Sequence, residues 1–76
     1  MKNYYNRPDT NVFLMIDNES NNVVFVNNTT KMKNVIVMTD TDSYSSFSSE
    51  ITDTSKWIPS DEETFTNLVT TIKSMF

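Results

Sequence analysis

Three short apolar runs stand out in the first half of the chain: Val12–Ile16, Val23–Val26 and Val35–Met38. They are rich in β-branched and aromatic residues, and each is shorter than a typical helix, so they predict strands. The polar connections between them, Asp17–Asn22 and Asn27–Asn34, are short enough for antiparallel hairpins. The chain contains no glycine, so any left-handed turn position must fall to asparagine or aspartate. This pattern predicts an antiparallel meander.

The last sixteen residues predict an amphipathic helix. Directly after Pro59, the sequence Ser60-Asp-Glu-Glu63 has the form of a capping box with Ser60 as N-cap. Acidic residues in the first turn and Lys73 in the last turn match the helix dipole. Apolar residues follow at spacings of three and four, namely Phe65, Leu68, Val69, Ile72, Met75 and Phe76. Threonines lower the intrinsic helix propensity here, but the periodicity and the cap outweigh them.

The segment Ser43–Ile58 has two interpretations. One is a helix with Asp42 or Ser43 as its cap, because three apolar residues would share one helical face: Tyr44, Phe47 and Ile51. The other is an irregular fourth edge strand within Glu50–Ile58. In either case we expect Trp57 and Ile58 to pack under the start of the C-terminal helix. The predicted fold is therefore a single α+β domain over residues 1–76, a small antiparallel β-meander of three to four strands packed against a C-terminal amphipathic helix.

The predicted strands are apolar on both faces, since their apolar runs do not alternate with polar residues. The C-terminal helix can cover only one face. The second face must be covered by the Tyr44–Ile58 segment, by the Tyr4-Tyr5 arm, or by another chain. Because the internal segments are short and hydrophilic, we expect a homodimer or partner interface there. The residues assigned to that interface are Phe13, Met15, Val24, Val26, Ile36 and Met38.

Composition narrows the possible chemistry. The 76 residues include no cysteine, histidine or glycine. Without cysteine or histidine there is no thiolate or imidazole for a zinc site, and no histidine-based catalysis. Without glycine, the phosphate-binding loops that need close backbone approach are excluded. We therefore expect no catalytic residues, no bound metal and no cofactor.

Asp40 and Asp42 are the one pair of residues in the sequence whose pattern suggests a catalytic site. The stretch VIVMTDTDS, an apolar run followed by Asp-Thr-Asp, resembles the first motif of haloacid-dehalogenase-type phosphatases. That resemblance implies Asp40 as the nucleophile and Asp42 as the general acid/base. It covers about nine residues, and Tyr44 stands where the family has threonine or valine. The family also needs a downstream lysine, a further acidic pair for magnesium and a much longer fold.

A calcium loop starting at Asp40 fits no better. Its sixth position would be Ser45 instead of glycine, and its twelfth would be Ile51 instead of glutamate. A weak magnesium or calcium contact from Asp40 and Asp42 stays open as an alternative. The interpretation we favour is that both aspartates end the strand, with carboxylates that accept backbone N–H bonds in a turn or helix cap.

Charge points toward a protein partner. The net charge is −4, and the segment 39–63 holds seven acidic residues against Lys56 alone: Asp40, Asp42, Glu50, Asp53, Asp61, Glu62 and Glu63. Only Lys31 and Lys33 cluster among the basic residues, so we expect no direct binding of nucleic acid. We assign these seven acids to the binding of a protein with a basic surface; the alternative is that the acidic segment is only a solvated face, as most acidic segments are.

The function expected from the sequence is a small acidic, non-catalytic interaction protein, not an enzyme. It would inhibit or modulate a larger macromolecule, as phage or viral inhibitors of host defence or host enzymes do, and the acidic segment could mimic nucleic acid. The first alternative is an assembly subunit that self-associates through an apolar sheet face. The second is a metal-dependent phosphoryl-transfer enzyme using Asp40 and Asp42. No stretch is apolar enough for a membrane span or a secretion signal, so we expect a cytoplasmic protein without membrane contact.

Overall fold

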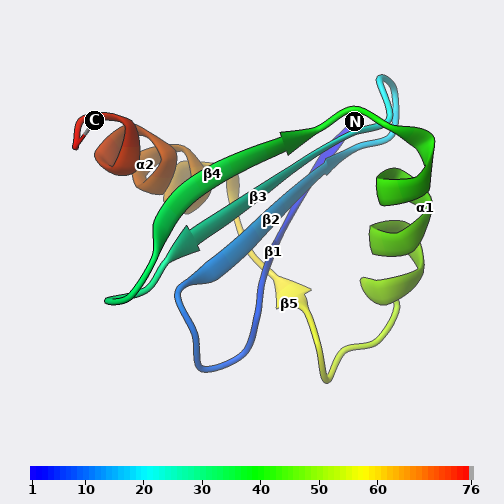
Figure 1. Ribbon diagram of the computed structural model, residues 1–76. Helices are drawn as coiled ribbons and strands as arrows, with labels where there is room; N and C mark the ends of the chain where they lie inside the picture. The colour runs from blue at the N-terminus through cyan, green and yellow to red at the C-terminus, as the bar shows by residue number, and fades with distance from the viewer. Residues whose placement is uncertain (76) are drawn as a thin grey trace.

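The computed structural model describes residues 1–75 and shows one antiparallel sheet with two helices (Figure 1). The five strands lie in the order β4-β3-β2-β1-β5. Their bounds are Lys2–Asn6 for β1, Val12–Asp17 for β2, Asn22–Asn28 for β3, Lys33–Met38 for β4 and Ile58–Pro59 for β5. The helices are α1, Thr41–Glu50, and α2, Glu62–Lys73. The predicted α+β class, with an antiparallel sheet and a C-terminal helix, is confirmed.

The three predicted strands form the meander β2-β3-β4. Val12 pairs with Asn27 and Asp17 with Asn22 in the first hairpin, and Val23 pairs with Met38 in the second. Two residues of the described chain other than glycine have positive φ, Asp9 at 59° and Asn21 at 60°. Both lie in connections between strands, which confirms that aspartate and asparagine take the left-handed positions in a chain without glycine.

The sheet has five strands instead of the expected three or four, because β1 and β5 extend it beyond β2. β1 pairs with the full length of β2, from Lys2 opposite Asp17 to Asn6 opposite Phe13. Only two neighbouring tyrosines break its otherwise polar sequence, so no apolar run marked it as a strand. β5 contributes two residues, which pair with Tyr5 and Asn6 of β1.

Helix α2 begins one residue later than predicted. Its N-cap is Asp61, whose carboxylate Oδ2 accepts a hydrogen bond from the Thr64 amide over 3.0 Å. Ser60 was the predicted cap, but its backbone amide donates instead to the Tyr4 carbonyl over 2.8 Å. Ser60 is therefore tied to β1, and the helix can start only after it. Phe76, the last apolar residue of the predicted helical face, lies outside the described residues.

The segment with two interpretations combines a helix and a strand. α1 runs to Glu50, and its N-cap is Asp40 instead of Asp42 or Ser43. After a turn, the chain returns to the sheet as β5 at the edge opposite β4 (Figure 1). The predicted strand within Glu50–Ile58 is thus reduced to the pair Ile58–Pro59.

Helix α2 covers one face of the sheet. Phe65 and Ile72 are buried against Phe13 and Val26. The partly buried side chains around them come from the same sheet face and the same helix: Tyr4, Met15, Val24, Val35, Leu68 and Val69. The 3- and 4-residue periodicity therefore identified the inner face correctly for Phe65, Leu68, Val69 and Ile72. Met75 was wrongly included, since it follows the end of α2 and is 53% exposed.

The second sheet face is covered by this chain itself. Leu14, Ile16 and Val23 are buried there together with Trp57, which is only 1% exposed. The side chains of α1 complete this cluster, with Tyr44, Phe47 and Ile51 packed against it. Trp57 had been expected beneath the start of α2. It lies on the opposite face, in the cluster that the α1 side chains cover, and Ile58, expected with it, is 40% exposed.

Candidate functional site

The two aspartates that follow β4 lie at the start of α1. The Asp40 carboxylate accepts a hydrogen bond from the Ser43 amide over 2.9 Å. Hydrogen bonds from Ser43, first from its amide and then from its hydroxyl, hold the pKa of Asp40 below its ordinary value. Asp42 is exposed in the first turn of the same helix. The favoured interpretation is therefore confirmed for Asp40, whose carboxylate caps the helix, whereas no backbone hydrogen bond to the Asp42 carboxylate is found within residues 1–75.

A metal centre would need more ligands than these two aspartates. Across residues 1–75, no group of three or more acidic, histidine or cysteine residues lies close enough together to hold a metal ion. The further acidic pair that the phosphatase motif needs for magnesium therefore does not gather around Asp40 and Asp42 in the described part of the chain.

Glu50 belongs to a partly exposed contact that joins three parts of the fold. Its Oε1 atom accepts hydrogen bonds from Arg7 over 3.0 Å and from the Trp57 indole over 2.8 Å. The Arg7 guanidinium also lies 4.8 Å from the centre of the Trp57 ring, a cation–π geometry. Glu50 therefore links α1 to the β1–β2 connection, and its charge is paired with that of Arg7 at the protein surface. Arg7 was not singled out from the sequence, because nothing local relates it to a residue 43 positions away.

Asp53 has a local structural role. Its Oδ1 atom accepts hydrogen bonds from the Ser55 hydroxyl over 2.6 Å and from the Ser55 amide over 3.0 Å. These bonds, the hydroxyl contributing most, lower the pKa of Asp53. Asp53 therefore shapes the turn between α1 and Trp57.

The start of α2 carries the densest group of accessible carboxylates. Asp61 caps the helix, and hydrogen bonds from Thr64, first from its amide, lower the pKa of Asp61. Glu62 and Glu63 are exposed, and neither forms an ion pair with any residue that the structure describes. Their charges are therefore available to a partner.

Tyr4 of β1 packs against α2, with its ring centre 5.3 Å from that of Phe65. Burial, then the charge of Glu62, then that of Asp17 raise the pKa of the Tyr4 phenol. Asp17 is at the end of β2, directly opposite Lys2 of β1. We call Asp61, Glu62 and Glu63 the α2 acidic patch. Asp17 has one ion pair, to the terminal amine over 3.8 Å.

The seven acids of segment 39–63 do not form one surface. Asp40 and Asp42 start the helix that covers one sheet face, whereas Asp61, Glu62 and Glu63 start the helix that covers the other. Glu50 and Asp53 are engaged within the fold. The structure thus brings together the last three of the seven predicted residues and separates them from the first two.

The six residues assigned to an oligomer or partner interface lie mostly inside the protein. Four of them pack in the α2 cluster, namely Phe13, Met15, Val24 and Val26. Met38 packs in the α1 cluster, and only Ile36 is exposed, at 43%. Its neighbour Val37, which the sequence did not single out, is 61% exposed. β4, the edge strand, therefore carries two neighbouring exposed apolar side chains; the other large exposed ones among the described residues are Met1, Met32, Ile58 and Met75.

No helix among the described residues is long and apolar enough to cross a membrane. Comparison of the sequence with protein-family models and with curated proteins, and of the fold with solved structures, finds no match.

Proposed function

We propose that this protein is a non-catalytic interaction protein that inhibits or modulates a larger macromolecule by binding its basic surface through the α2 acidic patch. The observation that carries the proposal is the exposure of Glu62 and Glu63 beside the Asp61 cap, without ion pairs in the described chain. Exposed carboxylates of one sign attract a basic surface over roughly 8–10 Å at physiological ionic strength. The partner is therefore a protein with clustered lysine or arginine.

The other carboxylates support a binding role over catalysis. Asp40 caps a helix, Asp53 shapes a turn, and Glu50 is tied to Arg7 and Trp57. Each of these groups has a structural partner at hydrogen-bond distance. A phosphoryl-transfer role for Asp40 and Asp42 would require a metal site, which the described residues do not provide.

The distribution of the acidic residues argues against mimicry of nucleic acid by the whole segment 39–63. A mimic must present its negative charges along one groove-filling surface, and the sheet divides segment 39–63 between two faces. We therefore assign binding to the α2 acidic patch and not to the whole acidic segment. Inhibition of a host enzyme or host defence system, and residence in the cytoplasm, stay predictions within this proposal.

Affinity capture tests the proposal. Tagged protein is incubated with cell lysate at low and high salt, and the retained proteins are identified and quantified. The test variant is Glu62→Lys with Glu63→Lys, which leaves the Asp61 cap in place. The control is Thr66→Lys with Thr70→Lys, which adds two cations at exposed sites farther along α2.

We expect the wild-type and control chains to retain the same basic proteins, and high salt or the glutamate reversal to release them. Retention that neither salt nor the reversal changes would contradict the proposal. Circular dichroism on each variant confirms that the fold persists.

A further inference from the structure

The two edges of the sheet differ in their protection. Exposed strand edges can pair with other chains, and natural proteins protect them with short strands and proline. β5 has both features, since it consists of Ile58 and Pro59 alone. β4 has six residues, contains no proline, and pairs only on its β3 side within the described chain. One edge is therefore closed to further pairing and the other is open.

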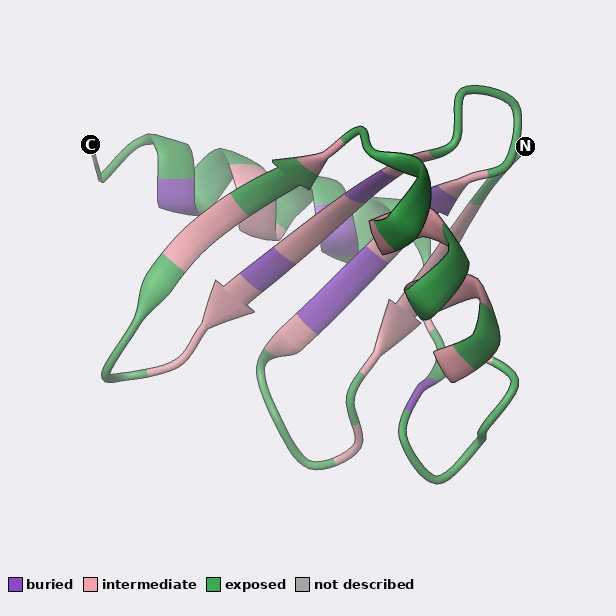
Figure 2. Cartoon of the chain, turned by 45° about the vertical axis from the view of Figure 1, so that its right-hand side comes forward, coloured by how far each residue is buried: buried purple, intermediate pink, exposed green. Residues whose placement is uncertain are grey.

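The open edge also carries apolar side chains. Val37 is 61% exposed, Ile36 43% and Met32, just before the strand, 54%. Figure 2 shows exposed stretches within β4, whereas the residues of β2 and β3 are buried or half-buried. Ile36 and Val37 point to opposite faces of the sheet. A strand added along β4 would therefore cover apolar surface on both faces while it satisfies the free backbone groups.

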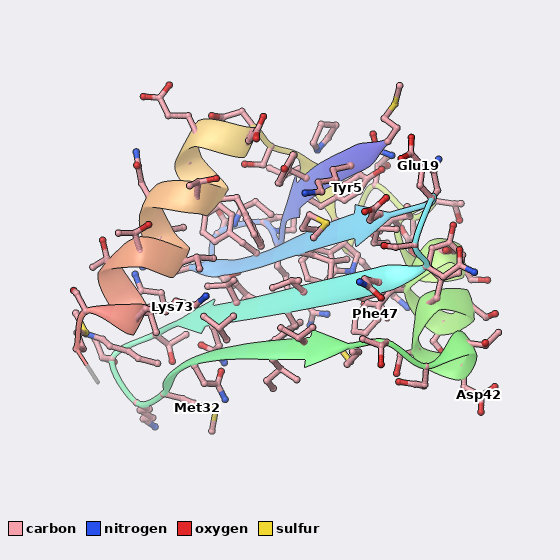
Figure 3. All side chains as sticks on the ribbon, turned by 90° about the horizontal axis from the view of Figure 1, so that it is seen from above. Tyr5, Glu19, Met32, Asp42, Phe47 and Lys73 are labelled. Carbon is pink, nitrogen blue, oxygen red and sulfur yellow. The ribbon has the colours of Figure 1, made fainter. Side chains whose placement is uncertain are left out.

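The charges at the two ends of β4 are opposite. Lys31 and Lys33 lie at its start, and Asp40 and Asp42 follow its end. Figure 3 shows Met32 at one end of the strand and Asp42 at the other, with Lys73 of α2 nearer the Met32 end. None of these lysines and aspartates forms an ion pair within residues 1–75.

We propose that β4 pairs edge to edge and antiparallel with β4 of a second copy of this chain, joining two sheets into one continuous sheet. Antiparallel pairing places the basic start of each strand beside the acidic end of the other, so that two sets of opposite charges meet. Parallel pairing would instead place like charges together. The charge pattern of a second copy of this chain therefore complements that of the β4 edge. In a dimer with two-fold symmetry the same contact between opposite charges forms at both ends of the paired strands.

The dimer would keep both helix layers intact. Antiparallel partners across a strand pair share a face, so the two α2 helices lie on one face of the joined sheet and the two α1 helices on the other. The first turn of α2 follows β5, at the edge away from β4. The α2 acidic patches would therefore stay accessible at the two outer ends of the dimer.

Sedimentation equilibrium on the full chain tests the pairing. We expect a reversible monomer–dimer equilibrium. Val37→Thr keeps a β-branched side chain but removes apolar contact, and it should raise the dissociation constant about tenfold or more. The matched control is Ile58→Thr at the protected edge, where the wild-type residue is 40% exposed. It should leave the dissociation constant unchanged.

A charge exchange tests the orientation. In a dimer of the Lys33→Glu variant, the introduced glutamate would face Asp42 of the second copy, and the two negative charges would repel. In a dimer of the Asp42→Lys variant, the introduced lysine would face Lys33, and the two positive charges would repel. Each variant should therefore be monomeric by itself. An equimolar mixture of the two variants should form a heterodimer, because each interface charge then meets its opposite. Circular dichroism establishes that both variants are folded. Lys56→Glu, in the loop before Trp57, is the control for net charge.

Amide hydrogen exchange on the wild-type chain provides a measurement without substitutions. The β4 amides should become more slowly exchanging as protein concentration rises, while those of β5 should not change. A folded chain that stays monomeric up to its solubility limit would overturn the proposal. So would a dimer that Val37→Thr does not weaken, or a mixture of the two charge variants that does not associate.

Discussion

The indole Nε1 of Trp57 donates a hydrogen bond to the Glu50 carboxylate over 2.8 Å, and this bond ties the last turn of α1 to the chain entering β5. Arg7 completes the contact from the β1–β2 connection. Trp57 is buried, and the Glu50 carboxylate is the acceptor of its N–H group. The α1 side of the fold therefore depends on one carboxylate that the sequence placed among the candidate binding residues.

The first prediction concerns this contact. Glu50→Ala should lower the free energy of unfolding by about 1–3 kcal/mol, because a buried donor is left unsatisfied. Glu62→Ala is the control, since that side chain is exposed. Denaturant unfolding followed by Trp57 fluorescence measures both. Equal effects of the two substitutions would show that Glu50 is an ordinary surface residue.

The second prediction concerns the start of α2. Asp61→Ala should destabilise the fold, because the Thr64 amide loses its acceptor. Ser60→Ala should change the free energy of unfolding by less than about 0.5 kcal/mol, since the contact of Ser60 with β1 is made by its backbone. Thermal unfolding distinguishes the two variants. If Ser60→Ala proves the more damaging one, Ser60 is the cap after all.

The third prediction concerns the inner face of α2. Ile72→Ala should cost about 2–5 kcal/mol, because this buried side chain leaves a cavity against Phe13 and Val26. Thr70→Ala should be neutral or slightly stabilising, as alanine is the better helix former at an exposed position. Urea unfolding measures both values. A loss at Thr70 as large as that at Ile72 would contradict the helix orientation.

The fourth prediction concerns pH. Hydrogen bonds lower the pKa of Asp40 and of Asp61 in the folded protein. A lowered pKa contributes stability that is complete above the unfolded value of about 4 and is lost as pH falls through the folded value. Stability should therefore fall as the solution is acidified below about pH 4.

Replacing both caps by asparagine gives the matched test, since asparagine also caps helices but does not titrate. The Asp40→Asn, Asp61→Asn protein should lose less stability on acidification than the wild type, as measured by urea unfolding across the acidic range. Asp17 and Asp53 also have lowered pKa values and should leave a residual dependence. Identical pH profiles for the two proteins would show that the caps are not the titrating groups.

Hydrophobic spacing along the sequence was sufficient to predict three of the five strands and the C-terminal helix. The runs of β2, β3 and β4 and the periodicity of α2 follow from hydrophobic spacing alone. β1 was missed because it is a strand only by virtue of its pairing with β2, and its own sequence is mostly polar. The cap at Ser60 was misplaced for a similar reason, since a hydrogen bond to Tyr4, far away in sequence, fixes where α2 begins.

The candidate site was less predictable than the fold. Sequence identified the seven acids of segment 39–63, but not that the sheet would divide them between its two faces. It recognised that both faces of the sheet are apolar, and it named the segment containing Tyr44 as one possible cover. It could not show that α1 and Trp57 suffice, nor that Val37 would be left exposed at the edge.

The most direct test of the central claim is the affinity of the captured partner, measured by titration calorimetry with purified proteins at several salt concentrations. We expect affinity to fall steadily as salt rises, to be lost with Glu62→Lys and Glu63→Lys, and to be retained with Thr66→Lys and Thr70→Lys. An affinity that is independent of salt, or that survives the glutamate reversal, would contradict a binding role for the α2 acidic patch.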